Sequence, residues 1–164
     1  MTIYFYSHTK KEDDEKDYRW MSNFYPSTFN AEGIEMKSSE QYFMWRKALT
    51  MGDKEIAEKI LESDTPDEAK ALGRKVKGYD DELWSKVSYD IMVEGLRYKF
   101  RQNRKLARAL LATYGEELAE AAKYDKKWGI GLTPKQARDG AKWNGQNLLG
   151  KALMQVRSEL LGEE

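Results

Sequence analysis

The 164-residue sequence contains no cysteine and a single histidine, His8. The absence of cysteine excludes disulfides, thiol nucleophiles and zinc sites built from thiolates. One histidine, expected in a loop or at the surface, favours neither a Ser-His-Asp triad nor a metal site of several imidazoles. Acid–base chemistry in this chain would therefore depend on carboxylates, lysines or tyrosines.

An excess of charge of either sign is also lacking, because 28 lysines and arginines balance 28 aspartates and glutamates. No overall field attracts nucleic acid or a membrane surface, so such a partner would need a local patch. No apolar run is long enough to span a bilayer, and residues 1–7 lead into a charged segment, residues 10–17, instead of a signal peptide. We expect a cytoplasmic chain that folds as a single domain over residues 1–164.

Residues 38–49 form the most informative stretch, because they predict a helix with apolar side chains on both sides. Ser38 is a good N-cap, and Gln41 completes a capping box just before the apolar run. At about 100° per residue, one face carries Tyr42, Trp45 and Leu49, and the opposite side carries Phe43, Met44 and Ala48. A helix that is apolar nearly all round is normally buried.

Within this helix, Glu40 and Lys47 lie within about 20° of each other on the helical wheel and roughly 10 Å apart along its axis. Burying an acid and an amine is costly unless they are paired, and burial shifts their pKa values as acid–base groups and amine nucleophiles require. The alternative is structural, with Glu40 favouring the helix dipole and Lys47 extending to solvent. The spacing alone favours this structural alternative.

The other elements are predicted from strand patterns, caps and turn residues. A strand is expected over residues 3–6 and a hairpin over residues 28–36. Helices are expected from residues 52–53, from the capping box at residues 65–68 to residue 73, over residues 81–100, 106–113 and 116–122, from the cap at residue 133, and from residues 144–145 onward. The predicted fold class is α+β, predominantly helical, with a small N-terminal β element.

A second candidate site is the segment 124–131, YDKKWGIG. Trp128 offers a stacking plane, and Gly129 and Gly131 would allow backbone amides to approach a ligand. Asp125 could act there as a base or hydrogen-bond acceptor, with Glu120 a turn or so upstream. The alternative is a surface loop whose tryptophan covers the core.

Two further arrays of basic or polar residues are weaker candidates. If one helix ran through residues 97–108, four arginines would share a face and could bind phosphates: Arg97, Arg101, Arg104 and Arg108. A helix break at Gln102-Asn103 would scatter them, and a solvated charged face is commoner. One side of the last helix could line a site or mark an ordinary amphipathic boundary, and it carries Asn147, Lys151, Met154 and Arg157.

Taken in order, these motifs resemble the YbiA-like, or NADAR, family over residues 3–160. Each motif is modest alone, but their joint order and spacing are highly specific. The matching segments are SNFY at 22–25, EQY at 40–42 with Lys47-Ala48, Gly73-Arg74, Trp84, Lys99-Phe100 with Asn103, residues 111–113, Glu120 with Asp125, WGIG at 128–131, and residues 147–150 with Met154 and Arg157.

The resemblance implies an N-glycosidase of predominantly helical fold that requires no metal or cofactor. Members are associated with hydrolysis of the C1–N bond of phosphoribosylamino-pyrimidine intermediates in riboflavin synthesis, and others remove ADP-ribose from guanine. The catalytic residues implied by motif position are Glu40, Lys47 and Asp125. The implied substrate-binding residues are Asn23, Phe24, Trp84, Glu120, Trp128, Gly129 and Gly131.

The chain departs from the family pattern in two places. Residues 42–45, Tyr-Phe-Met-Trp, are bulkier than the small residues often found before the lysine, and Tyr114-Gly115 replaces the usual Thr-Gly. The first departure could narrow or reshape the pocket. It leaves the choice between the two substrate classes open, with the small-molecule ribosyl phosphate favoured over modified nucleic acid.

The residues agree with this chemistry. Breaking a ribosyl C–N bond develops oxocarbenium charge that a carboxylate can stabilise. A lysine held partly neutral could instead form a Schiff base with C1 of an opened sugar. We predict that Lys47 is this amine and that Glu40 and Asp125 transfer protons. The rival from another class is a non-catalytic module that binds ADP-ribose or nucleic acid through the arginines and Trp128.

Overall fold

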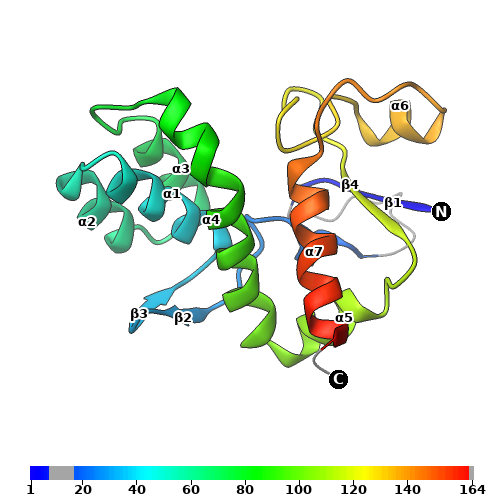
Figure 1. Cartoon of the computed structure of the whole chain (residues 1–164), viewed down its shortest axis with the longest axis horizontal. Helices are drawn as coiled ribbons and strands as arrows, with labels where there is room; N and C mark the ends of the chain where they lie inside the picture. Colours follow the sequence, from blue (N-terminus) through cyan, green and yellow to red (C-terminus); the bar gives the residue numbers. More distant parts are fainter. Residues whose placement is uncertain (8–16, 163–164) are drawn as a thin grey trace. The chain divides into compact units, whose positions relative to one another are not determined.

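A computed structural model describes residues 1–7 and 17–162, so His8 and most of the charged segment 10–17 lie outside the described residues. The chain divides into two compact units, which are considered separately. Unit 1 comprises Met1–Ser22 and Arg104–Glu164, and unit 2 comprises Asn23–Asn103. The described residues form seven α-helices and two two-stranded sheets, which confirms the predicted α+β, predominantly helical class (Figure 1). Among them, no helix is long and apolar enough to cross a membrane.

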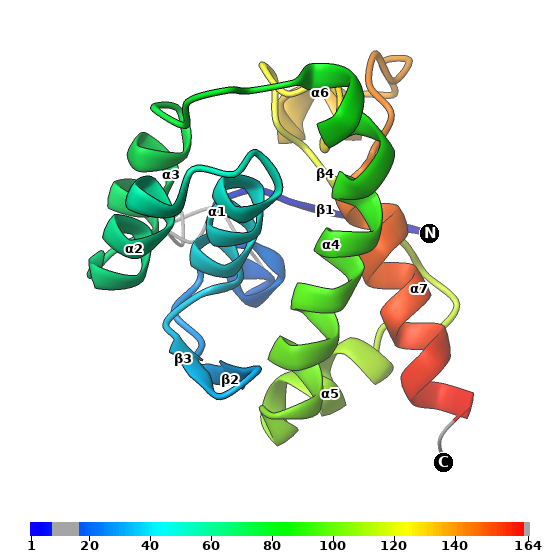
Figure 2. The same cartoon turned by 60° about the vertical axis from the view of Figure 1, so that its left-hand side comes forward.

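Unit 2 is organised around helix α1 (Ser39–Thr50), which contacts α2 (Lys54–Glu62), α3 (Pro66–Gly73) and α4 (Asp81–Arg101) (Figure 2). Neighbours on several sides explain why α1 carries apolar residues nearly all round. At the start of each helix a side-chain oxygen accepts a backbone N–H three residues later, from Ser38, Asp53, Thr65 and Asp80. The caps predicted at Ser38 and Thr65 are confirmed. Of the residues assigned to the helix faces, only Leu49 is exposed.

The capping box predicted at α1 is only half formed. Ser38 accepts the backbone N–H of Gln41, but the Gln41 side chain accepts the N–H of Lys37 instead of that of Ser38. The buried Gln41 amide nitrogen donates toward carbonyls at the end of α2, those of Ile60, Leu61 and Ser63. A buried amide needs several partners, so this glutamine links α1 to α2.

The predicted hairpin is present as β2 (Phe29–Ala31) and β3 (Ile34–Met36), paired antiparallel. Its two-residue turn has positive φ angles of 54° at Glu32 and 84° at Gly33, as a type I′ turn requires. The Gln102 side chain continues the pairing, because it accepts from the N–H of Asn30 and donates to its carbonyl, each at 2.7 Å.

The sequence-predicted break at Gln102-Asn103 is confirmed, since α4 ends at Arg101 and α5 (Arg104–Leu111) begins after it. The Asn103 amide donates to the carbonyls of Thr28 and Lys99 and thereby holds this break in place. The four arginines therefore do not share one helix face, because two lie on α4 and two on α5.

In unit 1, strand β1 (Thr2–Phe5) pairs in parallel with β4 (Glu117–Glu120), as Figure 1 shows. The prediction of a helix over residues 116–122 is therefore wrong. Glu, Leu and Ala favour helices locally, but here backbone groups bind a distant strand: Glu117 donates to Met1 and Ala121 donates to Phe5. The partner lies more than a hundred residues away, so no local pattern indicates it.

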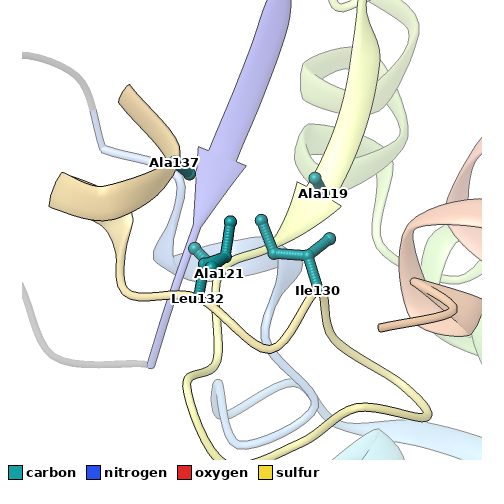
Figure 3. Packing of buried hydrophobic residues seen from close by; sticks show 5 residues of the cluster. All are labelled: Ala119, Ala121, Ile130, Leu132 and Ala137. Atoms are coloured by element: carbon teal, nitrogen blue, oxygen red, sulfur yellow. The ribbon is translucent and has the colours of Figure 1, made fainter. Parts of the chain in front are cut away.

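The core of unit 1 includes a cluster of small and branched side chains that lies beside β1, β4 and α6 (Pro134–Arg138): Ala119, Ala121, Ile130, Leu132 and Ala137 (Figure 3). Tyr4 and Trp143 pack against this cluster. Their two rings meet edge to face, with centroids 6.4 Å apart. Helix α6 begins with the complete capping box predicted at Thr133 and Gln136. A 3-10 helix, η1, covers Arg19–Met21.

Helix α7 (Leu148–Gly162) begins four residues later than predicted. The backbone N–H groups of Asn144, Gln146 and Asn147 donate to carbonyls of the loop at residues 126–130, as do those of Leu148 and Leu149 in the first turn of α7. Asn147 also has a positive φ of 54°. The predicted inner face is confirmed, because Leu149, Leu153, Val156 and Leu160 are buried, and α7 packs on β4 and α5.

Candidate functional site

In unit 2, Asn23 holds the first turn of α1. Its backbone carbonyl accepts the N–H of Glu40 at 3.1 Å, and its Oδ1 accepts the hydroxyl of Ser39 at 2.8 Å. The N–H groups of a first helical turn have no partner within the helix, so Asn23 supplies one from outside. Glu40 is thereby held in a defined place with only 8% of its surface exposed.

Lys47 lies two turns further along α1 and is half-buried. Its Nζ donates to the carbonyl of Gly73, the last residue of α3, at 3.0 Å and lies 4.9 Å from the ring centroid of Tyr79. Burial lowers the pKa of the Lys47 amine; the Glu40 carboxylate opposes this shift, and the positive charge of Arg74 reinforces it. The Glu40 carboxylate therefore acts electrostatically on the Lys47 amine, and a catalytic role for the pair stays a prediction.

Aromatic groups of the predicted site take part in packing within unit 2. Trp84, in the first turn of α4, is 5% exposed and lies against Phe43 with ring centroids 5.1 Å apart. Phe24 is half-buried, and the Nζ of Lys70 lies 5.4 Å from its ring centroid. A substrate-binding role for Trp84 and Phe24 stays a prediction.

The bulky residues of α1 fit because two glycines face them. A Cβ at Gly73 would lie 2.2 Å from the sulfur of Met44, and a Cβ at Gly95 would lie 2.7 Å from Cδ1 of Tyr42. Both distances are too short for real atoms. The bulk that departs from the family pattern is thus accommodated, at least in part, by the facing helices α3 and α4.

The buried Tyr42 hydroxyl belongs to a separate polar group with Arg46 and Glu94. Arg46 Nη1 donates to the Tyr42 hydroxyl and to the Glu94 carboxylate, each at 2.5 Å. Burial raises the pKa of Tyr42 to about 12, although the Arg46 charge acts in the opposite direction. Tyr42 therefore stays protonated at neutral pH and is not a suitable general base.

In unit 1, Asp125 organises the loop at residues 124–131. Its Oδ1 accepts the backbone N–H groups of Lys127 at 3.1 Å and Trp128 at 2.8 Å. This turn is typical of aspartate, and it holds the loop that presents the half-buried Trp128. Glu120 ends strand β4 nearby in sequence, and its carbonyl accepts the N–H of Ile130 at 2.9 Å.

Gly129 and Gly131 have a clear packing role. A Cβ at Gly129 would lie 2.9 Å from the carbonyl oxygens of both Glu120 and Asp125. At Gly131, where φ is 72°, a Cβ would lie 2.8 Å from the carbonyl oxygen of Asn144. The glycines therefore allow close contact between backbone segments, while their predicted contact with a ligand is untested.

Two residues of the polar edge predicted on the last helix support the structural alternative. The buried Asn147 side chain accepts the N–H of Glu120 and donates to the carbonyl of Leu118, so it fixes β4. The buried Arg157 donates to both the carbonyl and the hydroxyl of Thr113, and burial lowers its pKa. These contacts indicate that the edge stabilises unit 1.

Two neighbours of Lys47, Arg74 and Tyr79, were not assigned as site residues from the sequence, nor was Lys70, which lies one helical turn before Arg74. Burial and a hydrogen bond to Asp81 raise the pKa of Tyr79. The sequence feature that could have indicated Lys70 and Arg74 is their four-residue spacing at the end of a predicted helix. The proximity of Arg74 to Lys47 depends on tertiary packing of α3 against α1.

Unit 2 thus contains the buried Glu40 carboxylate and the Lys47 amine of lowered pKa, and unit 1 contains the aspartate–tryptophan–glycine loop. The chain belongs to the NADAR domain family, whose model matches residues 4–161.

Named relatives support this assignment. N-glycosidase R617 from Acanthamoeba polyphaga mimivirus is 43% identical over 145 residues, which are 84% of this chain and 85% of that protein. Riboflavin biosynthesis protein VVA0006 from Vibrio vulnificus is 36% identical over 162 residues, which are 96% of this chain but 38% of that longer protein.

The YbiA protein of Escherichia coli is similar in both sequence and structure. N-glycosidase YbiA of strain K12 is 33% identical over 148 residues, covering 90% of this chain and 85% of that protein. Its NMR structure superposes with a TM-score of 0.79 at 30% identity, covering 99% of this chain and 86% of that one. The family includes named N-glycosidases, which is the activity that the resemblance of the motifs implies.

Proposed function

We propose that this chain is an N-glycosidase and that it cleaves the C1–N bond of a phosphoribosylamino-pyrimidine intermediate of riboflavin synthesis. The observation that carries the proposal is the Glu40–Lys47 pair on α1, a buried carboxylate coupled to a half-buried amine of lowered pKa. Shifted pKa values of this kind favour acid–base and nucleophilic chemistry. Relatives named as N-glycosidases and as a riboflavin biosynthesis protein support the reaction class and the substrate.

In the proposed reaction, the ribosylamine opens to its imine form, and the neutral Lys47 amine adds to C1 of the sugar. The C1–N bond to the pyrimidine then breaks as the nitrogen of Lys47, already bonded to C1, forms a double bond to it and loses its proton. Glu40 supplies the proton that the departing pyrimidine amine takes, and the product on Lys47 is a Schiff base. Water adds to the resulting Schiff base, and the free ribose phosphate leaves while Lys47 regains its amine. No oxidant or metal enters the balance of this sequence.

Asp125 is the proposed second proton-transfer group, which directs the water. Its carboxylate has one oxygen engaged by the two loop amides of Lys127 and Trp128. That engagement orients the side chain, and rigid support is what a positioned acid or base needs. Asn23, Phe24, Trp84, Glu120, Trp128, Gly129 and Gly131 are the proposed substrate contacts.

The proposal is tested by incubating the protein with the phosphoribosylamino-pyrimidine and, in parallel, with ADP-ribosylated guanine, and by measuring the released base. We expect release from the pyrimidine substrate, and loss of most activity in Glu40→Gln and Lys47→Met. Matched controls are the exposed residues Glu35 and Lys54, as Glu35→Gln and Lys54→Met.

Release only from ADP-ribosylated guanine would replace the proposed substrate but keep the reaction. Salt-sensitive binding without release from either compound would contradict the proposal and favour the non-catalytic alternative.

A further inference from the structure

Helix α3 carries two positive charges on one face beside the Glu40–Lys47 pair. The N–H of Arg74 donates to the carbonyl of Lys70 at 3.2 Å, so the two residues are one helical turn apart. Their side chains therefore point to the same side of the helix. Like charges at this spacing destabilise an isolated helix by about 0.2–0.5 kcal/mol, and here both lie at the C-terminal end of α3, where the helix dipole favours cations.

No acidic partner is present for either side chain among the described residues. Lys70 contacts the face of Phe24, and Arg74 acts electrostatically on Lys47. Three other helix lysines in the described part of the chain pair with an acid four residues away: Lys59 with Glu55, Lys86 with Glu82 and Lys135 with Asp139. Lys70 and Arg74 are both exposed, so an anionic ligand can reach these two uncompensated charges.

These charges adjoin the proposed reactive amine. Lys47 Nζ donates to the carbonyl of Gly73, the residue immediately before Arg74. The Lys70 ammonium lies over the ring of Phe24. The residue before Phe24 is Asn23, and its carbonyl accepts the N–H of Glu40. Arg74 and Glu40 are the charged groups that act on Lys47, and Lys70 lies one helical turn before Arg74. An anionic group on the ligand would complement this excess of positive charge.

We propose that Arg74 and Lys70 bind the phosphoryl group carried on C5 of the ribosyl substrate while C1 of the sugar lies at Lys47. This inference rests on the proposed function, because it takes Lys47 as the reactive amine. A guanidinium presents two parallel N–H donors that match two phosphoryl oxygens, whereas an ammonium acts as a point charge. Arg74 is accordingly the main contact and Lys70 the supporting one. A phosphate monoester and the pyrophosphate of ADP-ribose both present this chemistry.

The test measures binding of ribose 5-phosphate, ribose and ADP-ribose by calorimetry, which requires no turnover. We expect ribose 5-phosphate to bind more tightly than ribose. Arg74→Gln should weaken binding of ribose 5-phosphate by roughly tenfold to a hundredfold, as loss of a hydrogen-bonded charge predicts. Lys70→Gln should have a smaller effect, and Arg74→Lys should fall between wild type and Arg74→Gln.

Lys75→Gln is the matched control, because Lys75 is the exposed neighbour of Arg74 and its loss changes net charge equally. In turnover assays, Arg74→Gln should raise KM, and it should also lower kcat because the Arg74 charge helps to lower the pKa of Lys47. A preference for the monoester over ADP-ribose, or the reverse, identifies the source of the phosphoryl group, and both support the subsite.

Equal affinities of wild type and Arg74→Gln for ribose 5-phosphate, or equal effects of Arg74→Gln and Lys75→Gln, would overturn the proposal. Absence of base release with intact, Arg74-dependent phosphate binding would instead contradict the proposed function alone. The two failures are therefore distinguishable.

Discussion

Replacing Lys99 by methionine should make the free energy of unfolding less dependent on pH. The Lys99 side chain on α4 is fully buried, at 0% exposure. Burial lowers the pKa of its amine from the ordinary 10.5 to about 7 in the folded protein. Methionine has a similar length and no charge, so Lys99→Met removes the titrating group with little change in packing volume.

The sign follows from proton binding. Between about pH 7 and pH 10.5, the unfolded chain keeps Lys99 protonated while the folded protein has released the proton. The unfolded state binds more protons there, so wild-type stability should rise with pH across this window. One pKa unit corresponds to about 1.4 kcal/mol. A shift of roughly 3.5 units, from 10.5 to about 7, therefore predicts a rise of up to about 5 kcal/mol.

The assay is urea unfolding of wild type, Lys99→Met and the exposed control Lys105→Met across this pH range. The stability gap between Lys99→Met and wild type should shrink by several kcal/mol as the pH rises, whereas the gap for Lys105→Met should stay nearly constant. At any single pH, the difference in free energy of unfolding also includes other contacts that the amine makes. Only the change of this difference with pH reports the titration of Lys99. Parallel pH profiles for wild type and Lys99→Met would refute the reasoning.

Three further substitutions test packing around the site. Gly95→Ala places a Cβ 2.7 Å from the Tyr42 ring and should cost about 1–3 kcal/mol in thermal unfolding, while an unchanged melting temperature would contradict the close contact. Asn147→Ala leaves the N–H of Glu120 and a β4 carbonyl without this side-chain partner and should cost about 1–3 kcal/mol in urea unfolding, whereas a neutral effect would argue against the bridge. Gln41→Met should increase amide hydrogen exchange at the end of α2, and unaltered exchange would mean that this glutamine does not hold it.

Features set by neighbouring residues could be predicted from the sequence. The N-caps at Ser38 and Thr65 act on an N–H three residues away, and the hairpin turn depends on the positive φ angles of its two adjacent residues, Glu32 and Gly33. The inner face of α7 follows from helical periodicity, because its residues are buried against a continuous surface. For the same reason, the proximity of Glu40 and Lys47 could be inferred from a helical wheel.

Features set by distant residues could not be predicted. Residues 117–120 form a strand because β1 offers backbone partners that override local helix preference. The complete burial of Lys99 depends on what packs on every side of α4, which hydropathy at one position does not indicate. The placement of Arg74 beside Lys47 likewise depends on how α3 meets α1. The candidate catalytic residues could thus be proposed from the sequence, within α1 and within one loop. The residues that surround them could be identified only from the structure.

The most direct test of the proposed reactive amine is reductive trapping with borohydride during turnover of the phosphoribosylamino-pyrimidine. The proposed chemistry predicts a stable ribosyl phosphate adduct on Lys47, located by peptide mass spectrometry and absent in Lys47→Met but present in Lys54→Met. Turnover without any adduct on Lys47, together with full activity of Lys47→Met, would contradict the central claim that this half-buried amine carries out the reaction.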